Sequence, residues 1–228
     1  MPTRANRIRK VIAGGLLLGA WLSVAAFAAE SLSDAPSTGD SQQQQQAQQQ
    51  NGSIAAGPEQ VVNRLHDTLL ALSSSELSVA ERAARLEPVV RETHNLAFIA
   101  RLMLRRDWEQ LDAQQRKQFL ERFARLSVMD YAGRFRDMQQ GQFAIRALDA
   151  SRANRARVEA ELTTRKRSVS FVYTLDHGEH GWQIVSIVVD GVSEMALRRN
   201  EYSDTLANQG FAALLALVDK QIAQRQAP

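Results

Sequence analysis

Apolar residues recur with two different periods along this chain. Between residues 58 and 135 they recur every three or four positions, as at Val61, Leu65 and Leu69, which predicts amphipathic helices. Between residues 155 and 175 they recur at every second position, which predicts strands. Two further segments with helical spacing follow after residue 191. Helices, then strands, then two closing helices form an α+β pattern.

The helical half contains residues that start or stop helices. Pro58 suits the first turn of a helix, and the serine run 73–75 ends it. Pro88 predicts a break or a fresh start in the next helical segment, which begins near Val79. Asp112 predicts the N-cap of a longer helix. The apolar side chains of that helix are Phe119, Phe123, Leu126, Met129, Tyr131 and Phe135.

The strand half predicts an antiparallel meander. Residues 155–163 alternate strictly between an apolar face and a charged face, which we expect to be solvated. The apolar face carries Ala156, Val158, Ala160 and Leu162, and the charged face carries Arg155, Arg157, Glu159 and Glu161. Residues 142–148 predict a weaker, peripheral strand, residues 169–175 predict the next strand, and residues 176–181 predict a hairpin loop.

The last strand, which begins at Gly181, is apolar on both faces. Its period-two positions are Trp182, Ile184 and Val188 on one face, and Val185, Ile187 and Val189 on the other. A strand with a solvated face would alternate between apolar and polar residues, so each face needs a cover, either a helix layer or an apolar ligand. The predicted fold is therefore α+β, with helices wrapped around a curved antiparallel sheet of about four strands that encloses an apolar cavity.

The N-terminus has the features of an export signal. A basic region at residues 4–10 precedes an uncharged apolar core, Val11 to Val24, and Ala26-Phe27-Ala28 fits the small-x-small cleavage rule. We expect a signal peptide over residues 1–28, and hence a periplasmic protein. An uncleaved inner-membrane tether is the alternative, although the apolar core is shorter than the ~20 residues that a spanning helix needs.

Composition then divides the remaining chain. Residues 29–57 are rich in Ser, Gln, Gly, Ala and Asp, and such a segment buries too little apolar area to offset its ordering entropy. We expect a disordered Gln-rich linker there, and a single lipid-binding domain over residues 58–228. The chain has no cysteine, so its core must hold the fold without disulfides.

Charge argues against a nucleic-acid partner. The chain has 28 lysines and arginines and 25 aspartates and glutamates, but four of the basic residues lie in the predicted signal peptide. The remaining 24 basic residues are balanced by the 25 acidic ones, whereas a nucleic-acid-binding domain is typically strongly basic.

The sequence offers few groups for catalysis or metal binding. His177 and His180 lie in the predicted hairpin loop with no third ligand nearby, and His66 and His94 are expected on helix surfaces. No Gly-rich phosphate loop, nucleophile elbow or paired-carboxylate motif occurs. We expect no catalytic residue, no metal and no cofactor. Asp-Tyr chemistry by Asp190 and Tyr173 in a small pocket remains the least favoured alternative.

The apolar surplus of the chain predicts a site for acyl chains. Bulky side chains are mixed with Ala156 and Ala160 on the inner face of the sheet, which suits a cavity for acyl chains. A pocket for two long chains must have a volume near or above the top of the usual range of roughly 300–1,000 Å³. The candidate lipid-binding residues are Phe98, Leu102, Phe123, Tyr131, Val158, Phe171, Tyr173, Trp182, Ile184, Met195, Tyr202 and Leu206. A non-catalytic interaction domain with a filled core is the runner-up.

Several blocks, taken in their order along the chain, resemble one family. They are Asn95–Arg101 with Trp108; Leu111, Gln115-Arg116 and Phe119 to Phe123 with Tyr131; Gly181-Trp182; Asp190-Gly191-Val192-Ser193; and Arg199 to Ser203 with Gly210-Phe211. Together they resemble the MlaC-like, or toluene-tolerance, family. The block Ser193–Tyr202 is similar to the HpnM-like branch associated with hopanoid biosynthesis.

The resemblance implies a soluble periplasmic carrier without catalytic activity. Such a protein holds the tails of a phospholipid, or of another diacyl lipid, in a cavity between sheet and helices. It exchanges the lipid with an inner-membrane ABC transporter complex and an outer-membrane lipoprotein complex. The hopanoid-associated branch leaves hopanoid-related lipid binding as an alternative.

Overall fold

The structure is a computed structural model that describes residues 56–73, 76–136, 138 and 141–226. The described helices and strands belong to one unit, Asn51–Pro228. The predicted signal peptide, 1–28, and the predicted linker, 29–57 apart from its last two residues, lie outside the described residues. Among the residues that are described, no helix is long and apolar enough to cross a bilayer.

The first two helices form as the apolar spacing predicts, with one exception at Pro88. Helix α2 spans Pro58–Ser73, and helix α3 spans Val79–Thr93 behind a capping box of Ser78 and Glu81. Pro88 lies inside α3 and does not break it, so the predicted break is wrong. The carbonyl that loses its hydrogen-bond donor belongs to Ala84, which is exposed, as is Pro88, so water can satisfy this carbonyl.

Three helices follow. Asn95 caps α4, Leu96–Leu104, through the amide of Phe98 at 3.0 Å. The short α5 spans Arg106–Gln110. Asp112 caps the long α6, Ala113–Arg134, in a capping box with Gln115, as predicted.

Arg105, between α4 and α5, has backbone angles that favour glycine. Its φ of 52° and ψ of −120° bring the Cβ atom of an L-residue into strain. The Arg105→Gly variant is therefore expected to raise the free energy of unfolding by about 1 kcal/mol. Urea denaturation measures this change. Arg106→Gly, inside the first turn of α5, is the control and is expected to destabilise the protein; equal effects of the two changes would contradict the assignment of strain to Arg105.

The sheet has five antiparallel strands in the order β1-β2-β3-β4-β5. They span Gln142–Arg152, Arg155–Thr163, Ser168–Gly178, Gly181–Val189 and Val192–Ser193. The predicted weak strand at 142–148 is the long, mostly exposed edge strand β1. The predicted loop over 176–181 is in fact a tight turn, because β3 continues to Gly178 and β4 starts at Gly181 with a φ of 78°.

A bulge in β4 changes the predicted division of its two faces. Leu175 pairs with Ile184 while Thr174 pairs with Ser186, which leaves Val185 as the extra residue. Trp182 and Ile184 before the bulge therefore share the inner face with Ile187 and Val189 after it. The prediction that Ile184 and Ile187 lie on opposite faces is wrong, because strict alternation ends at a bulge.

The segment between α3 and α4 is fastened to β4 at this bulge. The carbonyl of Ile184 accepts a 3.0 Å hydrogen bond from the amide of Asn95, and the side chain of Gln183 donates to the carbonyl of Glu92 at 3.2 Å. These bonds hold His94 and the start of α4 against the sheet.

Two antiparallel helices close the fold. Ser193 caps α7, Glu194–Gln209, which ends at Gly210 with a φ of 85°, and α8 spans Phe211–Gln226. This confirms the two closing helices predicted after residue 191.

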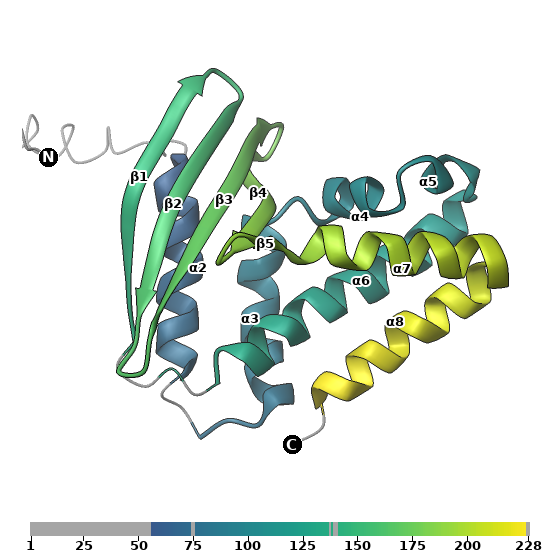
Figure 1. The fold of residues 1–228 in the computed structure, drawn as a ribbon, viewed down its shortest axis with the longest axis horizontal. Coiled ribbons are helices and arrows are strands. Elements are labelled where there is room, and N and C mark those ends of the chain that lie inside the picture. Colours follow the sequence, from purple (N-terminus) through teal and green to yellow (C-terminus); the bar gives the residue numbers. More distant parts are fainter. Residues whose placement is uncertain (1–55, 74–75, 137, 139–140, 227–228) are drawn as a thin grey trace, which may run out of the picture. The chain divides into compact units, whose positions relative to one another are not determined.

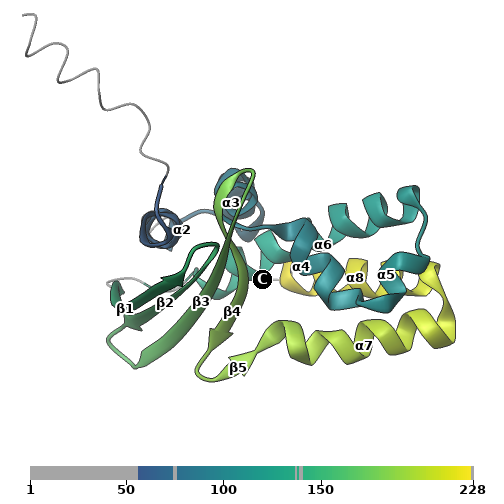
Figure 2. The same ribbon diagram turned by 90° about the horizontal axis from the view of Figure 1, so that it is seen from above.

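The layers explain where a cavity can form. Helices α2 and α3 lie on the concave face of the sheet, whereas α4, α6, α7 and α8 extend from its β4–β5 side (Figures 1 and 2). The inner positions of β2 and β3, from Ala156 to Leu175, are buried, and the opposite face carries the predicted charges. The α+β prediction is confirmed.

Candidate functional site

A cavity of about 360 Å³ lies between the inner face of the sheet and helices α4, α6 and α7. Its wall is mostly apolar. The apolar lining residues are Leu96, Ile99, Met103, Phe123, Phe135, Met138, Leu162, Val169, Phe171, Val185, Ile187, Val189 and Met195.

The volume of the cavity is near the lower end of the usual range for ligand pockets, so the expectation of a volume near or above the top of that range is wrong for this conformation. At roughly 30 Å³ per methylene, close to the share of a water molecule in the liquid, the cavity holds on the order of twelve methylenes.

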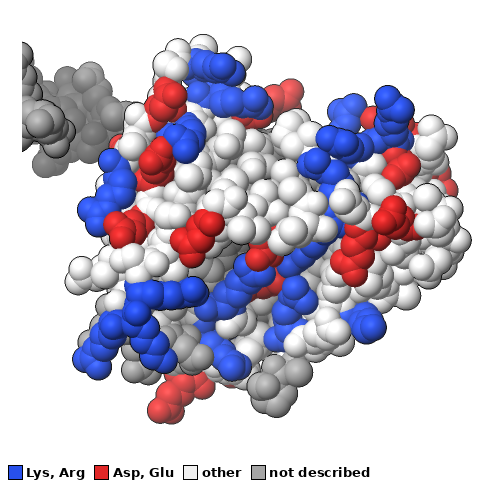
Figure 3. Space-filling view, in the orientation of Figure 1, with Lys and Arg blue, Asp and Glu red and all other residues white. Residues whose placement is uncertain are grey.

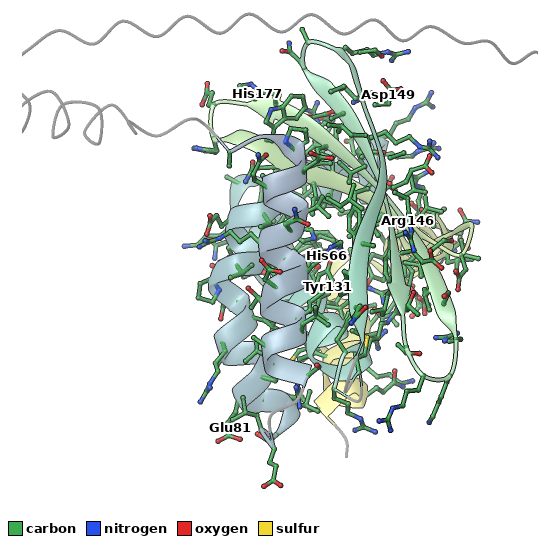
Figure 4. All side chains as sticks on the ribbon, turned by 90° about the vertical axis from the view of Figure 1, so that its left-hand side faces the viewer. His66, Glu81, Tyr131, Arg146, Asp149 and His177 are labelled. Atoms are coloured by element: carbon green, nitrogen blue, oxygen red, sulfur yellow. The ribbon has the colours of Figure 1, made fainter. Side chains whose placement is uncertain are left out.

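Two tyrosine hydroxyls on the cavity wall are hydrogen-bonded to histidines. The Tyr131 hydroxyl lies 2.8 Å from Nε2 of His94, and the Tyr173 hydroxyl lies 2.9 Å from Nε2 of His66. Tyr131, Tyr173 and His94 line the cavity. His66, on α2, lies behind this wall and stacks on Phe143, with 3.8 Å between the ring centroids. Figure 4 shows His66 and Tyr131 between the helices and the sheet.

Both histidines are buried, with exposed fractions of 2% for His66 and 5% for His94. The expectation that they lie on helix surfaces is wrong, because each has a tyrosine partner that is distant in the sequence. Burial removes hydration from the charged imidazolium and lowers the pKa of each histidine to about 4. Burial also raises the pKa values of Tyr131 and Tyr173. All four groups are therefore neutral at pH 7, as suits an apolar cavity.

Charged side chains occupy one part of the lining, which we call the rim. The rim consists of Asp130, Arg134, Arg167, Glu194 and Arg198. Asp130 accepts from Arg198 at 2.8 Å and also binds Arg225 of α8. Glu194 binds Arg134 and lies 3.3 Å from Arg198. These ion pairs join α6, α7 and α8 along the cavity lining.

The structure brings five of the twelve candidate residues together on the cavity wall: Phe123, Tyr131, Phe171, Tyr173 and Met195. The other seven lie elsewhere. Val158 and Ile184 are fully buried in the core. Trp182 and Leu206 pack against the core from outside, and Tyr202 is buried, with its hydroxyl donating to Gln221 at 2.6 Å. Phe98 and Leu102 line a separate surface groove with Arg101 and Arg105.

Other lining residues were missed by sequence reasoning. Val185, Ile187 and Val189 reach the cavity because of the bulge, for which the uniformly apolar strand gives no signal. Arg167 could have been found, because it has the same parity as Val169 and Phe171 on the inner face of β3.

The remaining candidate chemistry is dispersed. His177 is exposed and contacts the Trp182 ring. Asp190 is exposed and its carboxylate accepts from the amide of Ser170 at 2.8 Å, whereas Tyr173 is buried beside His66. Within the described ranges no group of three or more His, Cys, Asp or Glu side chains could hold a metal ion.

Comparisons with known proteins agree with this geometry. Residues 59–220 match the MlaC protein family. The structure of a phospholipid-binding protein from Ralstonia solanacearum, in complex with a phospholipid, matches with a TM-score of 0.68 and 17% sequence identity, over 75% of this chain and 100% of that one. At this identity the likeness shows a shared fold. None of the curated proteins matches the chain. Because the family match covers well over half of the sequence, the protein belongs to the MlaC family.

Proposed function

We propose that this protein is a lipid carrier that holds acyl chain in the cavity between its sheet and helices α4, α6 and α7. The observation that carries the proposal is a largely apolar cavity of about 360 Å³ whose charged residues are confined to its rim. Such an arrangement suits a molecule with an apolar tail and a polar head. The presence of the cavity also argues against the alternative of a filled core.

The energetics favour a carrier for such a molecule. Transferring a methylene out of water contributes about 0.8 kcal/mol, so the twelve or so methylenes that the cavity holds contribute on the order of 10 kcal/mol. A lipid with an acyl chain of that length leaves a membrane slowly unless a protein shields the acyl chain from water. This conformation has room for about one acyl chain, and both tails of a diacyl lipid need a wider cavity.

The comparisons support the lipid class and the role. The Ralstonia protein with the same fold holds a phospholipid, so a phospholipid is the ligand that we propose, ahead of a hopanoid-related lipid. Membership of the MlaC family favours a binding protein over an enzyme. We extend the proposal to exchange of the lipid, in the periplasm, with an inner-membrane ABC transporter complex and an outer-membrane lipoprotein complex.

Native mass spectrometry of the purified protein tests the central claim. We expect an added mass that fragments to a phosphate-containing lipid and disappears after extraction with organic solvent. A bare mass, together with no uptake of phosphatidylglycerol from vesicles by the extracted protein, would refute the proposal. A co-purified polycyclic lipid without phosphate would instead support the hopanoid-related alternative.

A further inference from the structure

The charges of the rim do not cancel. Both rim carboxylates are engaged: Asp130 by Arg198 and Arg225, and Glu194 by Arg134 and Arg198. Arg167 adds a further guanidinium, so the rim has three guanidinium groups and two carboxylates, and Arg225 of α8 supplies a fourth guanidinium from outside the cavity lining. The rim therefore has an excess of positive charge.

Arg167 differs from the other rim arginines because its charge has no partner within the part of the chain that the structure describes. Its side chain makes no hydrogen bond or ion pair with any residue that the structure describes, and it is exposed. Its backbone, in contrast, is fixed by Thr164, whose amide donates to the Arg167 carbonyl at 3.0 Å and whose hydroxyl donates to it at 2.8 Å. The turn therefore places a free guanidinium at a defined position.

Arg167 lines the cavity because it directly precedes β3, in step with the inner face of that strand. Val169, two residues on, is buried and lines the cavity, and alternate residues of a strand share a face. Arg165 and Lys166 belong to the same turn but are absent from the lining. Figure 3 shows Lys and Arg side chains gathered at the lower end of the sheet, where β2 and β3 connect, and in a band across the centre of that face.

An arginine in this position matches one chemical group of a lipid. A lipid phosphate lies between the acyl chains and water, as Arg167 lies between the apolar wall and water. The planar guanidinium donates two parallel hydrogen bonds to phosphate oxygens, which makes arginine well suited to this group. Building on the proposed function, we infer that Arg167 binds the phosphate of the bound lipid and selects phosphate-bearing lipids over neutral lipids with the same tails.

Two lipids with identical tails test this inference. Lipid-free protein is incubated with vesicles that contain either dioleoylphosphatidylglycerol or dioleoylglycerol, and occupancy is measured by native mass spectrometry. Wild type is expected to prefer the phospholipid by about tenfold, the effect of one charge-assisted contact at an exposed site. Arg167→Gln should bring this preference close to unity by lowering the uptake of dioleoylphosphatidylglycerol. Because Arg167 is exposed, the variant should keep the wild-type circular dichroism spectrum.

Arg165→Gln is the matched control, because it removes the same charge from the same turn but away from the cavity. It should keep the wild-type preference for the phospholipid. An equal loss of this preference in Arg165→Gln would mean that the overall positive charge of the turn causes the preference, without a specific contact by Arg167, and would overturn the inference. Equal uptake of both lipids by wild type and by Arg167→Gln would overturn it too, while the carrier proposal would stand. If wild type takes up neither lipid, both the inference about Arg167 and the carrier proposal are refuted. Inorganic phosphate should compete weakly, and competition at stoichiometric amounts would indicate a free-anion site and overturn the assignment to a lipid.

Discussion

Replacing Ile187 by glutamate is expected to expel the bound lipid and leave the protein folded. Ile187 lies opposite Tyr173 on β4, lines the cavity and is only half-buried. A carboxylate there can reach water once the cavity is empty, but it would be desolvated beside an acyl chain. At a cost of about 3 kcal/mol the affinity for lipid falls about 100-fold. Native mass spectrometry and thermal melting measure the two effects separately.

Val158→Glu provides the contrast, and Ile187→Leu the control. Val158 is fully buried and does not line the cavity, so its replacement places a carboxylate where neither water nor a partner can reach it. We expect the free energy of unfolding to fall by about 4 kcal/mol or more. Ile187→Leu should keep both lipid and stability. A lipid-loaded Ile187→Glu protein, or a Val158→Glu protein of wild-type stability, would contradict the assigned division between cavity wall and core.

Acidification from pH 7 to pH 5 is expected to destabilise the protein through His66 and His94. In the unfolded chain each histidine takes up a proton near its ordinary pKa of 6.5, whereas in the folded protein burial holds the pKa at about 4. The stability that the neutral forms provide is therefore complete above pH 6.5 and is lost as the pH falls towards 4. At pH 5 each histidine lowers the free energy of unfolding by about 2 kcal/mol.

Urea denaturation at the two pH values measures this loss. The His66→Gln variant keeps a hydrogen-bonding group near Tyr173 but cannot titrate, so it should lose about half of the pH dependence. His177→Gln, at the exposed end of β3, should behave as wild type. A wild-type stability that is equal at pH 5 and pH 7, or a His66→Gln protein with the full wild-type fall, would contradict the prediction.

The fold was predictable wherever a local pattern determines the structure. The strict alternation over 155–163 predicted both the strand and its solvated face, because a one-residue slip would bury Arg157 or Glu159. Asp112 predicted the start of α6, because capping depends on residues only three positions apart. Pro88 misled because its effect on a helix depends on whether water reaches the carbonyl four residues earlier, and burial is not a local property.

The candidate site was less predictable, because wall and core have the same composition. Phe171 and Val158 are both bulky apolar residues on inner positions of neighbouring strands, yet only Phe171 lines the cavity. What separates them is the position of α2, which contacts β1, β2 and β4 and fills the space above part of the sheet. His66 and His94 were misplaced for a related reason, since their partners Tyr173 and Tyr131 lie 107 and 37 residues away.

The two halves of β4, before and after the bulge at Val185, have different roles. Before it, Ile184 packs in the core and its carbonyl holds the start of α4; after it, Ile187 and Val189 line the cavity. Because alternation restarts at the bulge, substitutions at Ile187 and Val189 can reshape the ligand space while the fully buried Ile184 stays in place. Ligand preference can therefore diverge among descendants of such a protein through changes at these two positions, while selection for stability acts on Ile184 before the bulge.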